Sequence, residues 1–291
     1  MNESRPTALI GIDGGGTSCR FCLLYAGQRF EHRAGSANVS NDLAAAITTL
    51  RHGLEILADE AEIDSSALEE CTAYLGLAGV MNDDDSRAVA AAMPFRRVTV
   101  ADDRLSTVEG ALGEVEGAVA GIGTGSFIAA KTSEAVRFIG GWGPVFGDEG
   151  SGAWLGRRLL SETLLAEDGI VPHSDLSRAV LDEFGGAAGI VAYGRSATPA
   201  RFALRAPSVV EAAERGDETA VRLMGAGASY IVQSLKALDW ASDTRLCLTG
   251  GVGPHYRRYL PEDISAAVRS PEGNALDGSL ALAARMAGGT A

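Results

Sequence analysis

Hydrophobic residues in this chain come mostly in short runs that end at glycines, which predicts buried β-strands joined by tight turns. The first run, residues 8–12, leads into Asp13, three glycines and Thr17, and a second apolar run covers residues 19–25. An apolar run bounded by glycine is typical of a buried strand, and its return after the turn indicates a hairpin. A third strand is expected to reach about residue 33.

The next segments alternate between helical and strand patterns. In order, we predict a helix capped by Asn41 or Asp42 and running to about Ala61, a strand over 72–80, a helix from Asn82 to Pro94, a strand over 97–103 and a helix over 105–112. Three strands followed by helix, strand, helix, strand and helix are typical of a ribonuclease H-like α/β layer. Ligands bind such sheets at the carboxyl ends of their strands.

A second strand–turn–strand unit follows in the middle of the chain. Residues 118–130 repeat the plan, with Thr124 standing 107 residues after Thr17. That offset is a domain length rather than a short-repeat period. Ala120 takes the place of Asp13, so only the first turn carries a carboxylate. We interpret the two units as duplicated domains that hold one polyphosphate from both sides.

The rest of the chain contains a glycine-rich loop, several helices and a last strand. The loop, residues 140–152, displays Trp142, Asp148 and Glu149. The remaining expected elements are a hairpin to about 138, a helix over 153–166, a mostly helical stretch over 174–240, a strand over 244–249 that ends in glycines, and a closing helix over 277–286.

The glycine turns suggest chemistry as well as shape. Glycine lets the backbone take unusual φ values and come close to a ligand, and exposed N–H groups in such a turn suit phosphate oxygens. Asp13, at the edge of the first turn, could hold a divalent cation. A glycine-rich hairpin with no ligand explains either turn alone equally well, and the second copy favours phosphate binding.

Composition and charge narrow the function classes. With 291 residues, 46% of them hydrophobic and 22% charged, the chain is long enough for two soluble domains. A net charge of −13 predicts no sequence-independent binding to nucleic acid or to an anionic membrane. No apolar run approaches the roughly 18–20 residues of a membrane span, and no signal-peptide pattern opens the sequence, so we expect a cytoplasmic protein.

The cysteines are expected to be structural. Cys19 and Cys22 form a C-x-x-C pattern, but inside a predicted strand their side chains point to opposite faces. Cys71 and Cys247 also lie at or in apolar runs. We therefore interpret them as small apolar residues in a reducing compartment rather than as a metal or redox site.

Taken together, these motifs resemble the sugar kinase, heat-shock protein and actin superfamily. Within it, the chain is similar over nearly its whole length to the BadF/BadG/BcrA/BcrD ATPase family, especially its N-acetylglucosamine and glucosamine kinases. The matching segments are Gly11–Thr17 and Gly121–Ser126 for the two phosphate motifs, Leu248–Gly253 for the adenosine motif, and Gly141–Ser151 for a loop that is a hallmark of the amino-sugar kinases.

The resemblance implies an α/β fold with two ribonuclease H-like (actin-like ATPase) domains and an interdomain ATP cleft. The first domain is expected over residues 1–110, and the second, with a helical insertion, over 111–276. The closing helix, within 277–291, is expected to pack back on the first domain.

The resemblance also implies ATP and Mg²⁺ as cofactors. Carried over residue by residue, the nucleotide-binding set is Asp13, Gly14, Gly15, Gly16, Thr17, Thr124, Gly125, Gly250 and Gly251, with Asp13 also handling the metal. The sugar-binding set is Asn38, Asp103, Trp142, Gly143 and Asp148.

The catalytic base of the family follows a strand, about seven residues before a Gly-Ala pair. Gly110-Ala111 then places this base at Asp103. Asp102 occupies a position that is usually a small polar residue, so the choice between the two acids stays open, with Asp103 favoured.

The expected activity is transfer of the ATP γ-phosphoryl group to the 6-hydroxyl of glucosamine or N-acetylglucosamine. The alternatives are an ATPase activator of a radical dehydratase or reductase, which needs exposed cysteines for an iron–sulfur cluster, and a non-catalytic nucleotide- or sugar-sensing protein. The expected partner is a small-molecule amino sugar, with no nucleic acid and no membrane. The oligomeric state stays open, a homodimer included.

Overall fold

The computed structural model describes residues 8–40 and 42–288, which form two compact units. Unit 1 contains the chain up to Glu114 together with the segment from Pro271 onward, and unit 2 is Val115–Ser270. Asn41, one of the two expected helix caps, lies outside the described residues, as does the end of the predicted closing segment.

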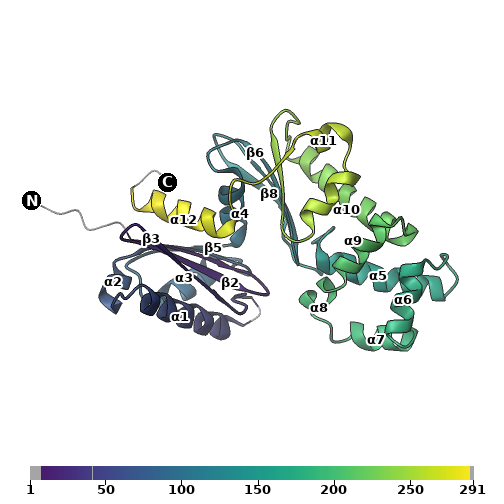
Figure 1. Ribbon diagram of the computed structural model, residues 1–291, viewed down its shortest axis with the longest axis horizontal. Coiled ribbons are helices and arrows are strands. Elements are labelled where there is room, and N and C mark those ends of the chain that lie inside the picture. Colours follow the sequence, from purple (N-terminus) through teal and green to yellow (C-terminus); the bar gives the residue numbers. More distant parts are fainter. Residues whose placement is uncertain (1–7, 41, 289–291) are drawn as a thin grey trace, which may run out of the picture. The chain divides into compact units, whose positions relative to one another are not determined.

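Unit 1 is built on a five-stranded mixed sheet in the order β3-β2-β1-β4-β5 (Figure 1). Its strands are β1 (Leu9–Gly14), β2 (Cys19–Tyr25), β3 (Gln28–Ala34), β4 (Thr72–Leu77) and β5 (Arg97–Ala101). The first three are antiparallel, and β4 and β5 continue the sheet parallel to β1. The predicted ribonuclease H-like α/β layer is confirmed.

Helices cover both faces of this sheet (Figure 1). They are α1 (Leu43–Glu60), α2 (Ser65–Glu69), α3 (Asp83–Ala92), α4 (Asp103–Leu112) and α12 (Ala275–Met286). The carboxylate of Asp42 caps α1 by accepting the N–H of Ala45 at 2.9 Å. The short helix α2 was not predicted.

Helix α4 begins two residues earlier than the sequence pattern indicated. The carboxylate of Asp102 accepts the backbone N–H of Arg104 at 2.9 Å, which makes Asp102 the N-cap and Asp103 the first helical residue. The strand predicted over 97–103 therefore stops at Ala101. Asp103 thus sits at the first turn of a helix, directly after the carboxyl end of β5.

Helix α12 packs closely on β1 and α4 because small residues face each other there. A Cβ on Gly278 would lie 1.9 Å from the carbonyl oxygen of Ser106, and one on Gly11 would lie 2.9 Å from Leu280. The hydroxyl of Ser279 donates to the carbonyl of Ile12 at 3.0 Å. The C-terminal helix therefore fixes the strand that ends in the first glycine turn.

Unit 2 has a second five-stranded mixed sheet, in the order β10-β9-β6-β7-β8. Its strands are β6 (Gly117–Ile122), β7 (Ser126–Lys131), β8 (Val136–Gly140), β9 (Arg245–Thr249) and β10 (Val268–Arg269). The helices are α5 (Gly152–Glu167), α6 (Asp175–Glu183), α7 (Ala187–Gly194), α8 (Pro199–Ala203), α9 (Ala206–Glu214), α10 (Glu218–Ala237), the 3₁₀ helix η1 (Gly253–Tyr259) and α11 (Glu262–Ala266). The short elements β10, η1 and α11 were not predicted.

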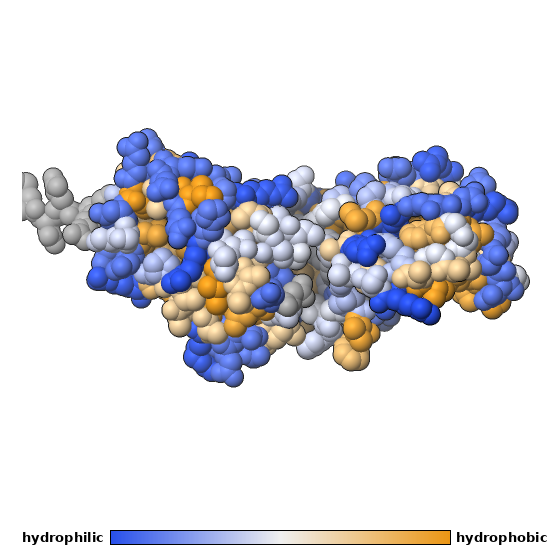
Figure 2. Space-filling view, turned by 90° about the horizontal axis from the view of Figure 1, so that it is seen from below, coloured by the Kyte–Doolittle hydropathy of each residue, from blue (hydrophilic) through white to orange (hydrophobic). Residues whose placement is uncertain are grey.

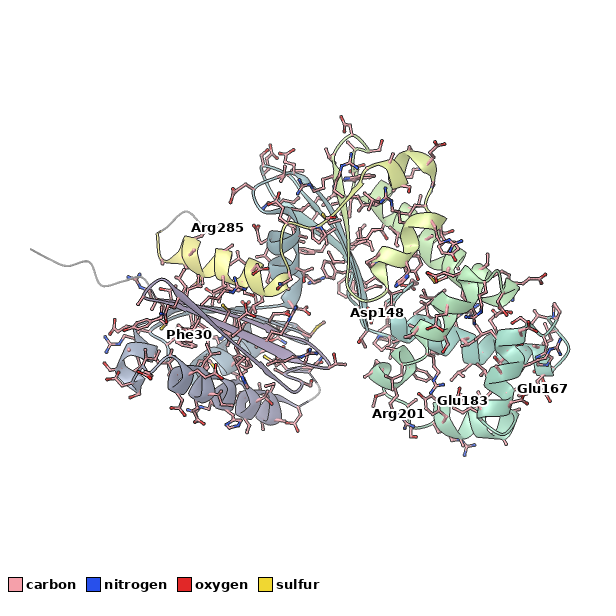
Figure 3. All side chains as sticks on the ribbon, in the orientation of Figure 1. Phe30, Asp148, Glu167, Glu183, Arg201 and Arg285 are labelled. Carbon is pink, nitrogen blue, oxygen red and sulfur yellow. The ribbon has the colours of Figure 1, made fainter. Side chains whose placement is uncertain are left out.

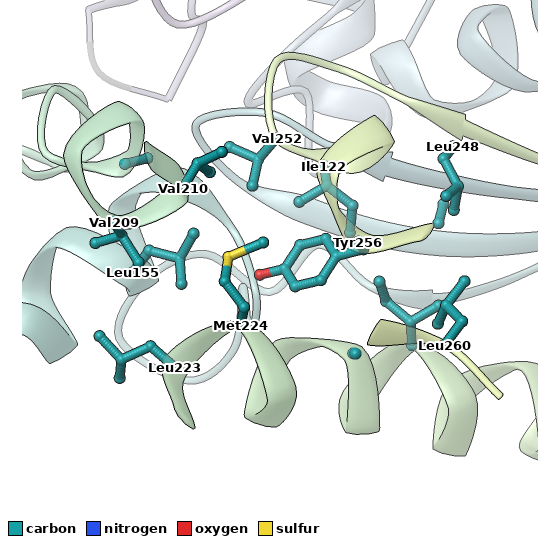
Figure 4. Close-up of a cluster of buried hydrophobic side chains, with 14 of the residues drawn as sticks. Ile122, Leu155, Val209, Val210, Leu223, Met224, Leu248, Val252, Tyr256 and Leu260 are labelled. Carbon is teal, nitrogen blue, oxygen red and sulfur yellow. The ribbon is translucent and has the colours of Figure 1, made fainter. Parts of the chain in front are cut away.

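The core of unit 2 gathers around Tyr256, which is fully buried among Ile122, Met224 and their neighbours (Figure 4). Its hydroxyl donates to the carbonyl of Gly150 at 2.6 Å. This bond anchors the end of the glycine-rich loop, residues 141–151, to the core. A loop held in this way can present side chains in fixed positions.

The face of the molecule in Figure 2 is largely hydrophilic, with hydrophobic residues in smaller patches. Within residues 8–40 and 42–288, no helix combines the length and the apolar character needed to cross a bilayer.

Candidate functional site

The first glycine turn closes directly after β1. The N–H of Gly15 donates to the carbonyl of Ser18 at 2.9 Å, and the carbonyl of Gly14 accepts the N–H of Ala78 at 2.7 Å. Gly16 and Thr17 are exposed, and a Cβ on Gly16 would meet nothing within 4 Å. The backbone at the tip of this turn is therefore accessible to a ligand.

We expected Gly14, Gly15 and Gly16 to allow unusual backbone φ values. This expectation is wrong, because none of the three adopts a positive φ. Space is the constraint at Gly14, where a Cβ would lie 2.6 Å from a methyl group of Leu77. The glycines therefore serve close packing and access rather than left-handed backbone.

Asp13 lies opposite Arg20 in the β1–β2 register, and the two side chains form an ion pair. Arg20 Nε donates to Asp13 Oδ2 at 2.9 Å, and Nη2 contacts the same oxygen. One carboxylate oxygen is thus bound to the arginine, and Oδ1 remains for another ligand. The sequence analysis missed Arg20, although the i, i+7 spacing across a tight hairpin could have indicated the pair.

The neighbouring acids Asp102 and Asp103 have different environments. Besides capping α4, the Asp102 carboxylate accepts Arg104 Nε at 2.9 Å and Nη2 at 2.9 Å. Among the described residues, no other side chain forms an ion pair or hydrogen bond with the Asp103 carboxylate. Asp102 is therefore engaged in local structure, whereas Asp103 is available for chemistry.

Burial raises the pKa of Asp103 to about 7, with further increases from the negative charges of Asp13 and Asp102. A carboxyl group with a pKa near neutrality can take up and release a proton under physiological conditions. Unit 1 thus brings Asp13 and Asp103 into electrostatic contact at the carboxyl ends of β1 and β5, although 90 positions separate them in the chain.

Asn38 lies on a loop that is tied to the first glycine turn. The N–H of Ala37 donates to the carbonyl of Gly15 at 3.3 Å, and the hydroxyl of Ser36 donates to the same carbonyl at 3.3 Å. The amide oxygen of Asn38 accepts the hydroxyl of Ser40 at 2.9 Å. The backbone N–H of Asn38 also donates to the Ser36 hydroxyl at 3.4 Å, so the expected sugar-binding asparagine and the first glycine turn share one hydrogen-bonded network.

The second glycine turn, residues 123–125, joins β6 to β7 and is linked to α5. The N–H of Gly123 donates to the carbonyl of Gly125 at 2.9 Å. The first N–H groups of α5 donate to the turn, from Gly152 to the carbonyl of Gly123 at 2.8 Å and from Ala153 to that of Thr124 at 3.1 Å. The turn and the helix N-terminus therefore form one unit of structure.

Asp148 lies at the end of the 141–151 loop, against this second turn (Figure 3). Its side chain is buried, with 6% of the residue exposed, and accepts the N–H of Ser126 at 3.3 Å. Burial raises the pKa of its carboxyl group. A φ of 63° at this non-glycine residue is a costly conformation, and such conformations gather at functional sites.

The start of the same loop is open. Trp142 is 69% exposed, and Gly143 has a φ of +79° with nothing within 4 Å of its Cβ position. The loop therefore exposes an aromatic side chain at one end and holds a carboxylate against the second turn at the other.

The third glycine turn follows β9. Gly250 has a φ of +80°, and a Cβ there would lie 2.3 Å from the carbonyl oxygen of Ile122. Glycine is therefore required for conformation and for space. The hydroxyl of Thr249 is buried without a hydrogen-bond partner, and Gly251 has nothing within 4 Å of its Cβ position. Thr249 was not among the expected site residues.

The residues present fit a Mg²⁺ ion that binds together with phosphate rather than one held by protein side chains alone. The described residues contain no group of three or more His, Cys, Asp or Glu side chains that could hold a metal. Mg²⁺ commonly uses one or two carboxylates and takes its other ligands from water and substrate phosphates. Asp13, with one oxygen left by Arg20, can supply such a carboxylate.

The cysteines do not fit an iron–sulfur site. All four are buried thiols. Burial raises the pKa of Cys22 and of Cys71 to about 11, which disfavours the thiolate that an iron ligand must be. The expectation that the cysteines are buried is confirmed.

Comparison with known proteins gives one family and several similar kinases. The BadF/BadG/BcrA/BcrD ATPase family matches residues 10–274. Glucosamine kinase GspK of Vibrio cholerae is 31% identical over 281 residues, which cover 95% of each chain. An N-acetyl-D-glucosamine kinase of Dictyostelium discoideum is 29% identical over 192 residues, which cover 60% of this chain and 59% of that protein.

A solved structure from Chromobacterium violaceum, provisionally described as an N-acetylglucosamine kinase, has a TM-score of 0.88 and 35% identity, covering 95% of this chain and 99% of that one. A Porphyromonas gingivalis structure with a similar description has a TM-score of 0.72 at 23% identity, covering 93% of this chain and 96% of that one, and supports the fold alone. With both sheets and the glycine turns in place, the chain belongs to the BadF/BadG/BcrA/BcrD ATPase family.

Proposed function

We propose that this chain is an ATP-dependent amino-sugar kinase that transfers the γ-phosphoryl group to the 6-hydroxyl of glucosamine or N-acetylglucosamine. Membership of an ATPase family supports the use of ATP. The names of the Vibrio cholerae and Dictyostelium discoideum relatives support an amino sugar as the acceptor.

The observation that carries the proposal is the environment of Asp103. Phosphoryl transfer to an alcohol needs a carboxylate that can accept the hydroxyl proton. The Asp103 carboxylate forms no ion pair or hydrogen bond with another side chain among the described residues, and its pKa is about 7. Asp102 is engaged by Arg104 and by the N-terminus of α4. We therefore assign the role of base to Asp103 and a structural role to Asp102.

Phosphate binding is proposed for the glycine turns. Thr17 and the backbone of Gly14, Gly15 and Gly16 would contact ATP phosphates from unit 1. Thr124 and Gly125 would do so from unit 2, with Gly250 and Gly251 beside the adenosine. Mg²⁺, held by Asp13, would offset the phosphate charge. That one nucleotide contacts the turns of both units stays a prediction.

Sugar binding is proposed for Asn38, Trp142, Gly143 and Asp148. An amide, a buried carboxylate and an exposed aromatic ring are typical of sugar sites, where polar groups fix the hydroxyls and an apolar face covers the ring. In the reaction, the acceptor oxygen forms a bond to the γ-phosphorus and the bond to the β–γ bridging oxygen breaks. The hydroxyl proton moves to Asp103, and the products are ADP and the sugar phosphate.

A coupled ADP-release assay over hexoses and amino sugars tests this proposal. Glucosamine or N-acetylglucosamine should give the highest kcat/KM in the panel, and the 6-deoxy form of the better substrate should give no phosphorylated product. Rapid turnover with a hexose that lacks the nitrogen, or phosphorylation of the 6-deoxy sugar, would contradict the proposed acceptor group.

A further inference from the structure

Unit 2 contains a cavity of about 310 Å³ that none of the expected site residues lines. Three segments form its walls. They are the 141–151 loop through Pro144, Val145 and Gly147, helix α5 through Ala153, Trp154 and Arg157, and α8 with the residues just before it through Ala197, Pro199 and Phe202. In Figure 3, Asp148 marks the loop and Arg201 marks α8. The volume lies at the lower end of the range for small-molecule sites.

The cavity adjoins the second glycine turn, for which phosphate binding is proposed. Ala153, in its wall, donates its N–H to the carbonyl of Thr124 in the second glycine turn. Gly147, in the opposite wall, lies between the proposed sugar contacts Trp142 and Asp148, and a Cβ there would be 3.4 Å from the Cβ of Trp142. The cavity therefore lies directly beside the loop that we propose to contact the sugar.

Close packing keeps the far wall in place. A Cβ on Gly156 would lie 2.0 Å from the carbonyl oxygen of Phe202, so α5 and α8 approach as closely as their backbones allow. The ring of Tyr193 contacts Phe202 edge to face at 5.9 Å between centroids. The cavity is therefore preformed.

The lining selects for an apolar and uncharged group. Seven of the nine lining residues have apolar side chains, and the loop side chains at its edge, Val145 and Phe146, are 74% and 85% exposed. Arg157 carries the only charge among the nine and forms no ion pair or hydrogen bond within the described part of the chain. A protonated amine placed there would meet apolar walls and a like charge, whereas an acyl group would not.

We propose that this cavity binds the acyl group on the acceptor nitrogen, so that the chain phosphorylates N-acylated glucosamine in preference to the free amine. This inference rests on the proposed function and chooses between its two acceptors. The space beyond an acetyl group also predicts that longer acyl chains are accepted, because each methylene removed from water favours binding about fourfold.

The test is kcat/KM for glucosamine and its N-acetyl, N-propionyl and N-butyryl derivatives with the full-length protein. N-acetylglucosamine should exceed glucosamine by at least about tenfold, and the value should rise again to N-butyrylglucosamine. A steady fall from glucosamine to the longest chain would overturn the inference and leave the kinase proposal standing. Absence of turnover with every amino sugar would reject both.

Two substitutions test whether the preference for N-acyl groups arises in this cavity. Ala197→Phe fills the cavity from a position outside the core and should lower the ratio of kcat/KM for N-butyrylglucosamine over glucosamine about tenfold. Arg157→Met should lower the ratio for N-acetylglucosamine over glucosamine about threefold, because the like charge is removed. The matched control is Val191→Phe, on the exposed surface of α7, which should change neither ratio.

A third variant guards against simple misfolding. Phe202→Ala enlarges the cavity and should move the preferred acyl chain toward greater length, a gain that damage to the fold cannot produce. If all these variants keep the wild-type ratios while retaining the wild-type thermal unfolding midpoint, the acyl group does not enter this cavity.

Discussion

At the scale of single residues, the two adjacent acids at the end of β5 have different environments although they look alike in sequence. Asp102 is paired with Arg104 and caps α4, whereas Asp103 is left with a raised pKa. The choice between them was open from the sequence because the family spacing favours Asp103 but the extra acid breaks the usual pattern. Capping geometry, which depends on where the helix begins, supports the same assignment.

Replacing Asp103 by Asn is expected to lower kcat by roughly 10²–10⁴, because the amide cannot accept the hydroxyl proton. ATP affinity should stay within about threefold of wild type, since no nucleotide contact is assigned to this side chain. Steady-state kinetics and calorimetric titration with a non-hydrolysable ATP analogue measure the two quantities. Unchanged turnover would remove Asp103 from the mechanism.

The pKa of Asp103 predicts the pH dependence of the wild-type enzyme. The base must be ionised, so kcat/KM should rise with pH through about 7 and level off above it. Because the folded-state pKa lies above the unfolded one, the contribution of this group to stability is present at low pH and is lost as pH rises toward 7. The Asn variant should therefore unfold at a higher temperature than wild type at pH 8, and the two should converge near pH 4.

Asp102→Ala is expected to affect stability more than turnover. Loss of the cap should destabilise the protein by about 1 kcal/mol, seen as a lower midpoint of thermal unfolding, while kcat falls less than about tenfold. The acidic limb of the pH profile should also move to lower pH, because a negative charge beside Asp103 is removed. A loss of turnover as large as that of the Asp103 variant would assign the base to Asp102 instead.

At the scale of elements, the contact surface of the closing helix α12 could not be predicted from sequence patterns. Its helical character was predictable from its apolar spacing, but its contact surface depends on glycines at Gly11, Gly110 and Gly278, which look like weak helix or strand residues until they face one another. Close backbone approach is a property of a pair of elements, so a single stretch of sequence does not reveal it.

Gly278→Ala is therefore expected to destabilise the protein by roughly 1–3 kcal/mol, because the new methyl group overlaps the carbonyl of Ser106. The matched control is Gly225→Ala in α10, where a Cβ meets nothing within 4 Å and the gain in helix propensity should be neutral or stabilising. Chemical denaturation of both variants decides the point, and equal stabilities would show that α12 can shift without cost.

The 141–151 loop shows the other limit of sequence reasoning. Its glycines, tryptophan and acids predict a functional segment, but the cavity behind it needs α5 and α8 as well. Phe202 of α8 lies 51 positions after the end of the loop. Apolar residues there look like ordinary core. The signal that separates them is a space bounded by three segments, which only the folded chain contains.

At the scale of the whole molecule, an α/β fold with two similar sheets followed from the repeated strand–glycine turn–strand plan. The short elements α2, α11 and β10 did not, since pieces of two to five residues carry too little periodicity to stand out. The domain boundaries expected at residues 110 and 276 stay predictions, and the compact units change over at Glu114 and Pro271.

The burial of every cysteine gives a whole-molecule prediction. A thiol reagent such as DTNB should react slowly with all four thiols of the native protein and rapidly with four after denaturation, because none is exposed and burial disfavours the thiolate. Rapid reaction of one or two thiols in the native protein would show that a cysteine is accessible, and the iron–sulfur alternative would need to be considered again.

The most direct test of the central claim is ³¹P NMR of the products when the protein is incubated with MgATP and N-acetylglucosamine. The account predicts ADP and a sugar 6-phosphate in equal amounts, with little inorganic phosphate. With the Asp103→Asn variant, the sugar phosphate should form at least about a hundredfold more slowly. ADP and inorganic phosphate without a sugar phosphate would contradict it, because the chain would then hydrolyse ATP without using the acceptor.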